Sequence, residues 1–270
     1  MIPLRVFFRT CLVIPAVVQG INSSYRSCAQ SPGASPSFEV ATIKPANQND
    51  KSRFIIMQGE NRFVVKGYSL KLMIAAAYDV SPKVISGGPA WIESDHFDIE
   101  ALTPGATKPV REEQMAMLRD LLLERFKLSF HREPKTTSIY ELQVAKSGLR
   151  LKQSTAAESS PAALITTVFP DHLHLPARNA TMGEFVSVLQ RAVLDRPVVD
   201  KTGLKGRYDF DLDWAADESQ FGGEVPVASE NAPSPPFFTA IEQELGLRIE
   251  AKRGPVDALI VDMAQQPTAN

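Results

Sequence analysis

The sequence predicts an α+β protein in which one helix-and-sheet unit occurs twice. Two stretches near the ends of the halves match position by position, and each half carries a run of alternating apolar and acidic residues. Apolar residues at helical spacing precede both runs. We expect each copy to run strand-helix-strand-helix-strand-strand, with its helices on one face of an antiparallel or mixed sheet.

The matching stretches each read as a helix followed by two strands. They cover residues 117–144 and 240–263, and their apolar positions align without a gap: Phe126 with Leu245, Leu128 with Leu247, Phe130 with Ile249, Leu142 with Val261 and Val144 with Met263. We place the first copy at residues 38–150 and the second at residues 164–265. The small, polar stretch 151–163 between them is typical of a linker.

An earlier helix is expected in each copy, opening at Ser69-Leu70 and at Thr181-Met182. Thr181 and Glu184 have the spacing of a capping box, in which each side chain satisfies a free backbone donor. Strands follow at residues 96–101 and 208–213, whose alternation buries the apolar residues and leaves the carboxylates in solvent. The second copy also carries a long loop, residues 215–233, of a length that is either functional or disordered.

The first residues have the layout of a secretory signal peptide. Arg5 and Arg9 flank an apolar start, residues 10–18 form a short apolar core, and small residues precede a cleavage site after Ala29. We therefore expect residues 1–29 to direct export to the periplasm or the extracellular space. Contact with a membrane would come only through this segment, if it stays uncleaved.

Composition excludes several classes of protein. Hydrophobic residues make up 44% and charged residues 22%, as in ordinary soluble globular proteins. The net charge is −2, with basic and acidic residues interspersed, so nucleic acid is not expected as a partner. The two cysteines, Cys11 and Cys28, both fall in the signal segment, which leaves the mature domains without a disulfide or a thiolate ligand.

Several stretches along the chain form a recognisable set: residues 38–46 (FEVATIKPA), 87–101 (GGPAWIESDHFDIEA), 117–133 (MLRDLLLERFKLSFHRE), 200–214 (DKTGLKGRYDFDLDW), 244–262 (ELGLRIEAKRGPVDALIVD) and 267–270 (PTAN). Together they resemble a family of unknown function that is soil-associated and expanded in Acidobacteria. The resemblance implies an exported protein. It also implies a domain of the kind found behind membrane metallopeptidase segments of the antibiotic-sensor type, and it carries no catalytic residue to this chain.

Two groups of polar residues invite a chemical interpretation. His172 and His174 are two apart, so on a strand both point to one face, but no third ligand is evident and no metal site is expected. Residues Asp209, Asp211 and Asp213 form a carboxylate ladder on the outer face of a strand. We expect this face to be solvated and, if the strands are neighbours, neutralised by Arg248 and Lys252.

The surface most suited to binding is expected at two places. Gly87 and Gly88 permit unusual backbone angles and Trp91 offers a large contact area, although Trp91 at the edge of the core is an equal alternative. His131 and Glu133 point to the same side of a strand and could cooperate. Motifs for a serine nucleophile, a phosphate loop, a dinucleotide and a zinc protease are all absent, so no catalytic residue and no cofactor is predicted.

These observations favour a non-enzymatic binding module of the cell envelope, whose partner is an envelope protein or peptide. A hydrolase of an envelope polymer or peptide, using His131 and Glu133 or the Asp209, Asp211 and Asp213 face, is the alternative from another class. A third interpretation, from the pattern of the repeated unit, is a periplasmic module like those of secretins or receptor plugs.

Overall fold

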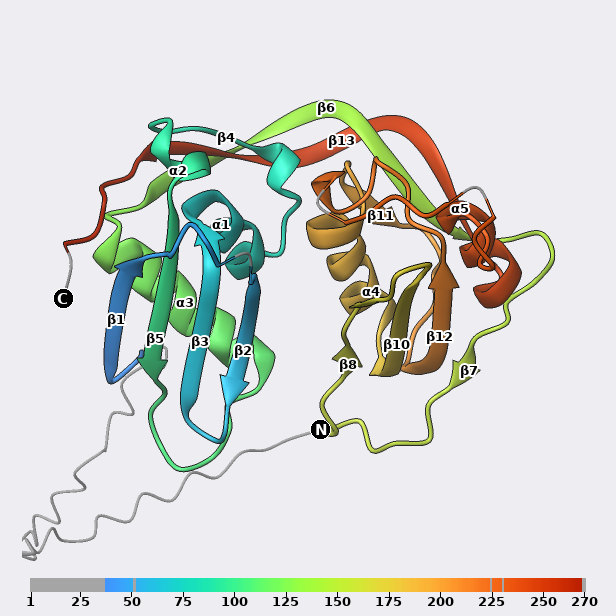
Figure 1. Cartoon of the computed structure of the whole chain (residues 1–270), viewed down its shortest axis with the longest axis horizontal. Coiled ribbons are helices and arrows are strands. Elements are labelled where there is room, and N and C mark those ends of the chain that lie inside the picture. Colours follow the sequence, from blue (N-terminus) through green and yellow to red (C-terminus); the bar gives the residue numbers. More distant parts are fainter. Residues whose placement is uncertain (1–36, 51, 224, 230, 269–270) are drawn as a thin grey trace, which may run out of the picture. The chain divides into compact units, whose positions relative to one another are not determined.

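Three β-sheets with helices packed against them make up the described part of the chain (Figure 1), which confirms the α+β class. The computed structural model describes residues 37–50, 52–223, 225–229 and 231–268. The predicted signal segment, residues 1–29 with both cysteines, lies outside these ranges. Within them, no helix combines the length and the apolar character needed to cross a membrane.

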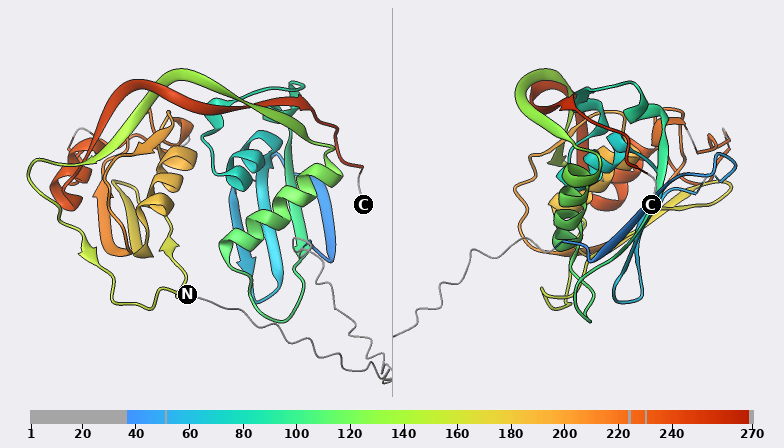
Figure 2. Two further views of the ribbon diagram at one scale, coloured as in Figure 1. Left: turned by 180° about the vertical axis from the view of Figure 1, so that it is seen from behind. Right: turned by 90° about the vertical axis from the view of Figure 1, so that its left-hand side faces the viewer.

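The first sheet, sheet A, is antiparallel throughout and is covered by helices on one face (Figure 2). Its strands, in spatial order, are β1 (Val40–Pro45), β5 (His96–Leu102), β3 (Arg62–Ser69) and β2 (Phe54–Gln58). The helices are α1 (Leu70–Tyr78) and α3 (Arg111–Arg125). As the alternation predicts, Phe97 and Ile99 of β5 are buried and join the core of this sheet.

The second sheet, sheet C, has a comparable layer of helices. Its strand order is β7 (Lys152–Gln153), β12 (Tyr208–Trp214), β10 (Leu173–Ala180) and β8 (Ala163–Leu164), with β9 (Thr167–Val168) also paired to β10. Two helices, α4 (Met182–Val188) and α5 (Phe237–Ala240), continue into the π-helical turns η2 (Leu189–Val193) and η4 (Ile241–Leu245). Trp214, Phe185 and Phe237 are fully buried in the core beneath this sheet.

The third sheet, sheet B, corrects one prediction. Each matching stretch forms a single long strand after its helix, where two strands were expected. These strands, β6 (Ser129–Val144) and β13 (Leu247–Met263), pair antiparallel along their length, with β11 (Val198–Asp200) parallel to β6 and β4 (Ile85–Gly87) parallel to β13. One end of the β6–β13 pair packs into the core of sheet C, and the other end packs into the core of sheet A.

Each long strand contains a proline that does not interrupt it. The Ala145 N–H donates to the Gly246 carbonyl. In this register, the odd-numbered residues of β6 exchange backbone hydrogen bonds with the even-numbered residues of β13. Pro134 and Pro255 therefore fall at positions whose nitrogen points away from the partner strand. Neither proline removes a bond from the ladder, and the chain stays extended where a turn was predicted.

Helix starts agree with the sequence. The Ser69 hydroxyl accepts a hydrogen bond from the Leu72 N–H at the start of α1. At α4, the Thr181 hydroxyl accepts from the Glu184 N–H while the Glu184 carboxylate accepts from the Thr181 N–H, so the capping box is confirmed. The remaining short elements are η1 (Pro82–Val84), α2 (Trp91–Ser94) and η3 (Phe221–Gly223).

The linker and the long loop both make specific contacts. Residues Lys152–Gln153 of the linker form β7 and pair with β12, and the buried Asn179 amide donates to the Ala157 and Ser160 carbonyls. In the loop, buried Gln220 accepts a hydrogen bond from the Trp214 indole at 2.7 Å. The internal duplication itself stays a prediction.

Candidate functional site

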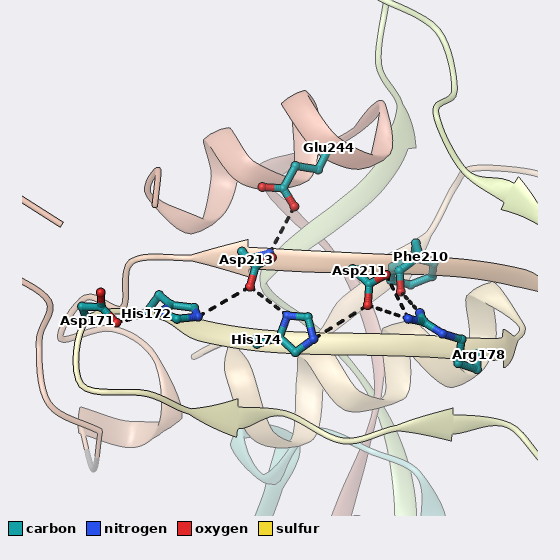
Figure 3. Close-up of polar contacts among 8 residues, drawn as sticks. All are labelled: Asp171, His172, His174, Arg178, Phe210, Asp211, Asp213 and Glu244. Atoms are coloured by element: carbon teal, nitrogen blue, oxygen red, sulfur yellow. Dashed lines mark hydrogen bonds and ion pairs between the residues drawn. The ribbon is translucent and has the colours of Figure 1, made fainter. Parts of the chain in front are cut away.

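Two neighbouring strands of sheet C bring together the residues with the richest chemistry. β10 and β12 pair antiparallel with His174 opposite Asp213 and Pro176 opposite Asp211. Leu173, Leu175 and Ala177 of β10 are buried in the core, so their neighbours point to the outer face. We call the resulting row of polar groups (Figure 3) the His–Asp strip, made up of Asp171, His172, His174, Arg178, Asp211 and Asp213.

His174 lies at the centre of the strip between two carboxylates. Its Nδ1 is 2.8 Å from the Asp213 Oδ1, and its Nε2 is 3.8 Å from the Asp211 Oδ1 (Figure 3). With the ring proton placed on Nδ1 to donate to Asp213, Nε2 carries the free lone pair and is the atom available to a ligand. The side chain keeps 31% of its surface exposed.

His172 extends the strip beyond the start of β10. Its Nδ1 is 2.7 Å from the Asp171 Oδ1, and this hydrogen bond lowers the pKa of the Asp171 carboxyl. The other ring nitrogen, Nε2, is 3.8 Å from the Asp213 Oδ1. The ring stacks on Phe169 with 4.6 Å between centroids and 6° between planes. Phe169 and its neighbour Val168 are exposed, so an apolar shelf borders the polar row.

Arg178 closes the opposite end of the strip. One of its guanidinium nitrogens donates to both carboxylate oxygens of Asp211, at 2.8 and 3.0 Å, and the other donates to the Phe210 carbonyl at 2.7 Å. Behind the strip, the Glu244 carboxylate accepts the Asp213 N–H, and its burial raises the Glu244 pKa. These contacts hold the two aspartates in place.

The expected neutralisation of the aspartate ladder by Arg248 and Lys252 is wrong. Both residues lie on β13, which pairs with β6 and β4 and not with β12. Lys252 instead donates to Glu141 at 2.6 Å, and Arg248 lies 3.2 Å from Glu250. Asp211 and Asp213 meet their partners on β10, while Asp209 accepts the Asn179 N–H, which lowers the Asp209 pKa.

His131 and Glu133, predicted to cooperate on one side of a strand, do lie together. The His131 Nε2 is 3.1 Å from the Glu133 Oε1, and its Nδ1 is 2.8 Å from the Asp262 Oδ1 on β13. Hydrogen bonds to Glu133 and then Asp262 raise the pKa of His131, because both ring nitrogens face acceptors that favour the imidazolium. The ring is about half-exposed on sheet B.

Gly87, Gly88 and Trp91 make a different set of contacts. Gly87 and Gly88 have φ angles of 79° and 72°, and a Cβ at Gly87 would come within 2.6 Å of the Val261 carbonyl oxygen. Both glycines therefore let β4 approach β13 closely. Trp91 is partly buried, with its ring 6.5 Å from Phe126 and 6.2 Å from Phe97 between centroids. These contacts join it to the core of sheet A.

The sequence did not reveal that the histidine pair and the aspartate ladder form one site. Each has a spacing of two on a strand, which places its members on one face, but the register between the strands is not local information. Among the described residues, no group of three or more histidine and carboxylate side chains is arranged to hold a metal ion. The strip instead offers carboxylate and imidazole acceptors in a row.

Comparison with known proteins gives one match. The family model described as "Protein of unknown function (DUF3738)" matches residues 71–264. No curated protein and no solved structure matches the chain. The matched range includes the whole His–Asp strip as well as His131, Glu133 and the Gly87–Trp91 turn.

Proposed function

Because the chain belongs to the family described as "Protein of unknown function (DUF3738)", which assigns no activity, we propose a function from the geometry: an exported, non-enzymatic binding module of the cell envelope. Its partner is a protein or peptide of that compartment. The first 29 residues, with the layout of a signal peptide, support export to the periplasm or beyond. The resemblance to a soil-associated family expanded in Acidobacteria points to the same setting.

The openness of the His–Asp strip is the observation that carries this proposal. Its histidine side chains are 28% and 31% exposed, and those of Asp211 and Asp213 are 48% and 42% exposed. Electrostatic catalysis depends on fixed dipoles in a site from which water is excluded. Water has access to every group of the strip, which weakens such an effect. Binding needs no such exclusion, since rims of protein interfaces are polar and wet.

The chemistry of the strip indicates what it binds. The strip contains three aspartates and one arginine, and the imidazole Nε2 atoms are acceptors when neutral. Such a row accepts hydrogen bonds from amide, ammonium and guanidinium groups, which peptides supply. The exposed Phe169 beside His172 adds an apolar contact at one end. A peptide segment with donors and an apolar residue fits both parts.

A site-specific photo-crosslinker tests the proposal in the native envelope. Pro176 lies on the outer face of β10 between His174 and Arg178, so a photoreactive residue there should capture the partner. The same residue in place of Thr42, on the outer face of sheet A, is the matched control. We expect a crosslinked species from position 176 that disappears in D211N/D213N. Equal capture from both positions would contradict the proposal.

One observation favours a hydrolase as the second candidate. The Asp213 carboxylate orients His174 through Nδ1 and leaves the lone pair on Nε2 free to accept a proton, as a general base requires, with Nε2 3.8 Å from the Asp211 Oδ1. A hydrolase would act through this face or through the pair His131 and Glu133. Hydrolysis of envelope peptides or polymers that is lost in H174Q would establish this function in place of binding.

A further inference from the structure

Strand β2 leaves one edge of sheet A open (Figure 1). The Thr103 N–H donates to the Asn61 carbonyl. In this register, the odd-numbered residues of β3 form backbone hydrogen bonds with β5, and the even-numbered residues form them with β2. In β2 the even residues therefore face β3, and the N–H and C=O groups of Ile55 and Met57 point outward. No described residue bonds to these outward groups.

Every other sheet edge in the described ranges is blunted. At β1, the Arg125 guanidinium donates to the Ala41 carbonyl, and the strand ends at Lys44 and Pro45. In sheets B and C the outermost strands are only two or three residues long, and the stretches of β6 and β13 that extend beyond β11 and β4 carry charged residues and one proline each. Proteins ordinarily protect sheet edges by shortness, charge or proline. β2 has five residues, FIIMQ, with no charge and no proline.

The side chains of β2 determine what can lie beside it. Ile55 and Met57 pack partly against the core on the helix side, and Ile56 on the opposite face is 41% exposed. The cations on the adjoining strand are already paired, Arg62 with Glu100 and Lys66 with Asp98. A charged residue placed beside β2 would lose water without gaining a partner. An apolar residue there would extend the core.

We propose that β2 binds an extended, uncharged peptide segment of a partner protein, which joins sheet A as an additional strand. Main-chain hydrogen bonds to Ile55 and Met57 supply affinity, and apolar side chains at alternate positions supply selectivity. This surface lies on sheet A and the His–Asp strip lies on sheet C. The inference shares with the proposed function only the expectation of a peptide partner.

Binding of synthetic peptides to the full chain tests this inference. The probes are five-residue peptides of the form X-Thr-X-Thr-X, with X as Val, Ile, Leu or Phe and blocked ends, measured by fluorescence anisotropy. We expect at least one to bind. N-methylation of alternate residues removes the donors from one edge of a peptide, so one methylation pattern should weaken binding at least about tenfold and the other should leave it unchanged.

Variants of the protein separate the possible outcomes. M57P removes an outward N–H while keeping the bonds to β3, so it should weaken binding by about tenfold. H172A/H174A alters only the strip and should bind the peptides as the unaltered chain does. If no probe binds, or if both methylation patterns weaken binding equally, the inference is wrong even where the crosslink from position 176 is found. A dimer that depends on β2 would overturn the choice of occupant.

Discussion

Gly246 ends the turn η4 where a side chain has no room. Its φ is +64°, and an added Cβ would overlap the Gly148 carbonyl oxygen and lie 2.9 Å from the Arg150 nitrogen. The adjacent backbone is tied to the same segment, since the Arg150 N–H donates to the Leu245 carbonyl and the Ala145 N–H donates to the Gly246 carbonyl. The substitution G246A therefore meets both a conformational and a steric penalty.

The two penalties can be estimated and separated. The left-handed conformation costs an alanine about 1–2 kcal/mol, and overlap with packed neighbours costs about 1–3 kcal/mol. G246A should thus lower the free energy of unfolding by about 2–5 kcal/mol. Gly203 has a φ of +67° with nothing within 4 Å of an added Cβ, so G203A meets only the conformational penalty.

Urea denaturation of the two variants, followed by circular dichroism, measures the difference. G246A should unfold at a clearly lower urea concentration than G203A, with similar slopes for both transitions. Equal midpoints would refute the close approach of residues 148–150 to the end of η4. If both variants unfold at a much lower urea concentration than the unaltered chain, and by the same amount, the backbone angle alone sets the cost.

Three further predictions concern single side chains. W91A should lower the free energy of unfolding by about 3 kcal/mol, measured by urea titration, because the ring packs on Phe97 and Phe126; unchanged stability would favour a role in recognition alone. The pKa of His131, followed by NMR, should lie above 6.5 and fall in E133Q/D262N. Because this pKa is raised in the folded state, the stabilisation it brings is complete below pH 6.5 and is lost as the pH rises through the folded pKa; a pKa at or below 6.5 would contradict the two hydrogen bonds. N179A should be less stable than N179G by about 1–2 kcal/mol in thermal melts, since glycine tolerates the φ of 51° while both variants lose the bonds to Ala157 and Ser160; equal melting temperatures would argue against this backbone strain.

Local patterns in the sequence predicted the local elements. Ser69 and Thr181 identified helix starts because capping involves residues close in the chain, and the alternation around Phe97 and Phe210 identified strands. Pairing between distant segments left no comparable signal. Two strands were expected after each helix where one long strand forms, and Pro134 and Pro255 do not interrupt the ladder of β6 and β13 because their nitrogens point away from the partner strand.

In the polar site too, local patterns were predictable and the pairing of distant strands was not. His172 and His174 were expected on one face, and so were Asp211 and Asp213, but their meeting depends on the register of β10 with β12. The partners expected for the aspartates, Arg248 and Lys252, were wrong for that reason. Arg178 neutralises Asp211 because it lies within reach on β10, a fact that only the paired sheet reveals.

Chemical footprinting of histidines tests most directly whether the His–Asp strip is a binding surface. Diethyl pyrocarbonate should modify His172 and His174 in the isolated protein, since both side chains are partly exposed. Addition of a native envelope fraction should lower the rate at which these two residues are modified. The rate for His96, the control, should stay the same. Modification of His172 and His174 at the same rate with and without the envelope fraction would contradict the account.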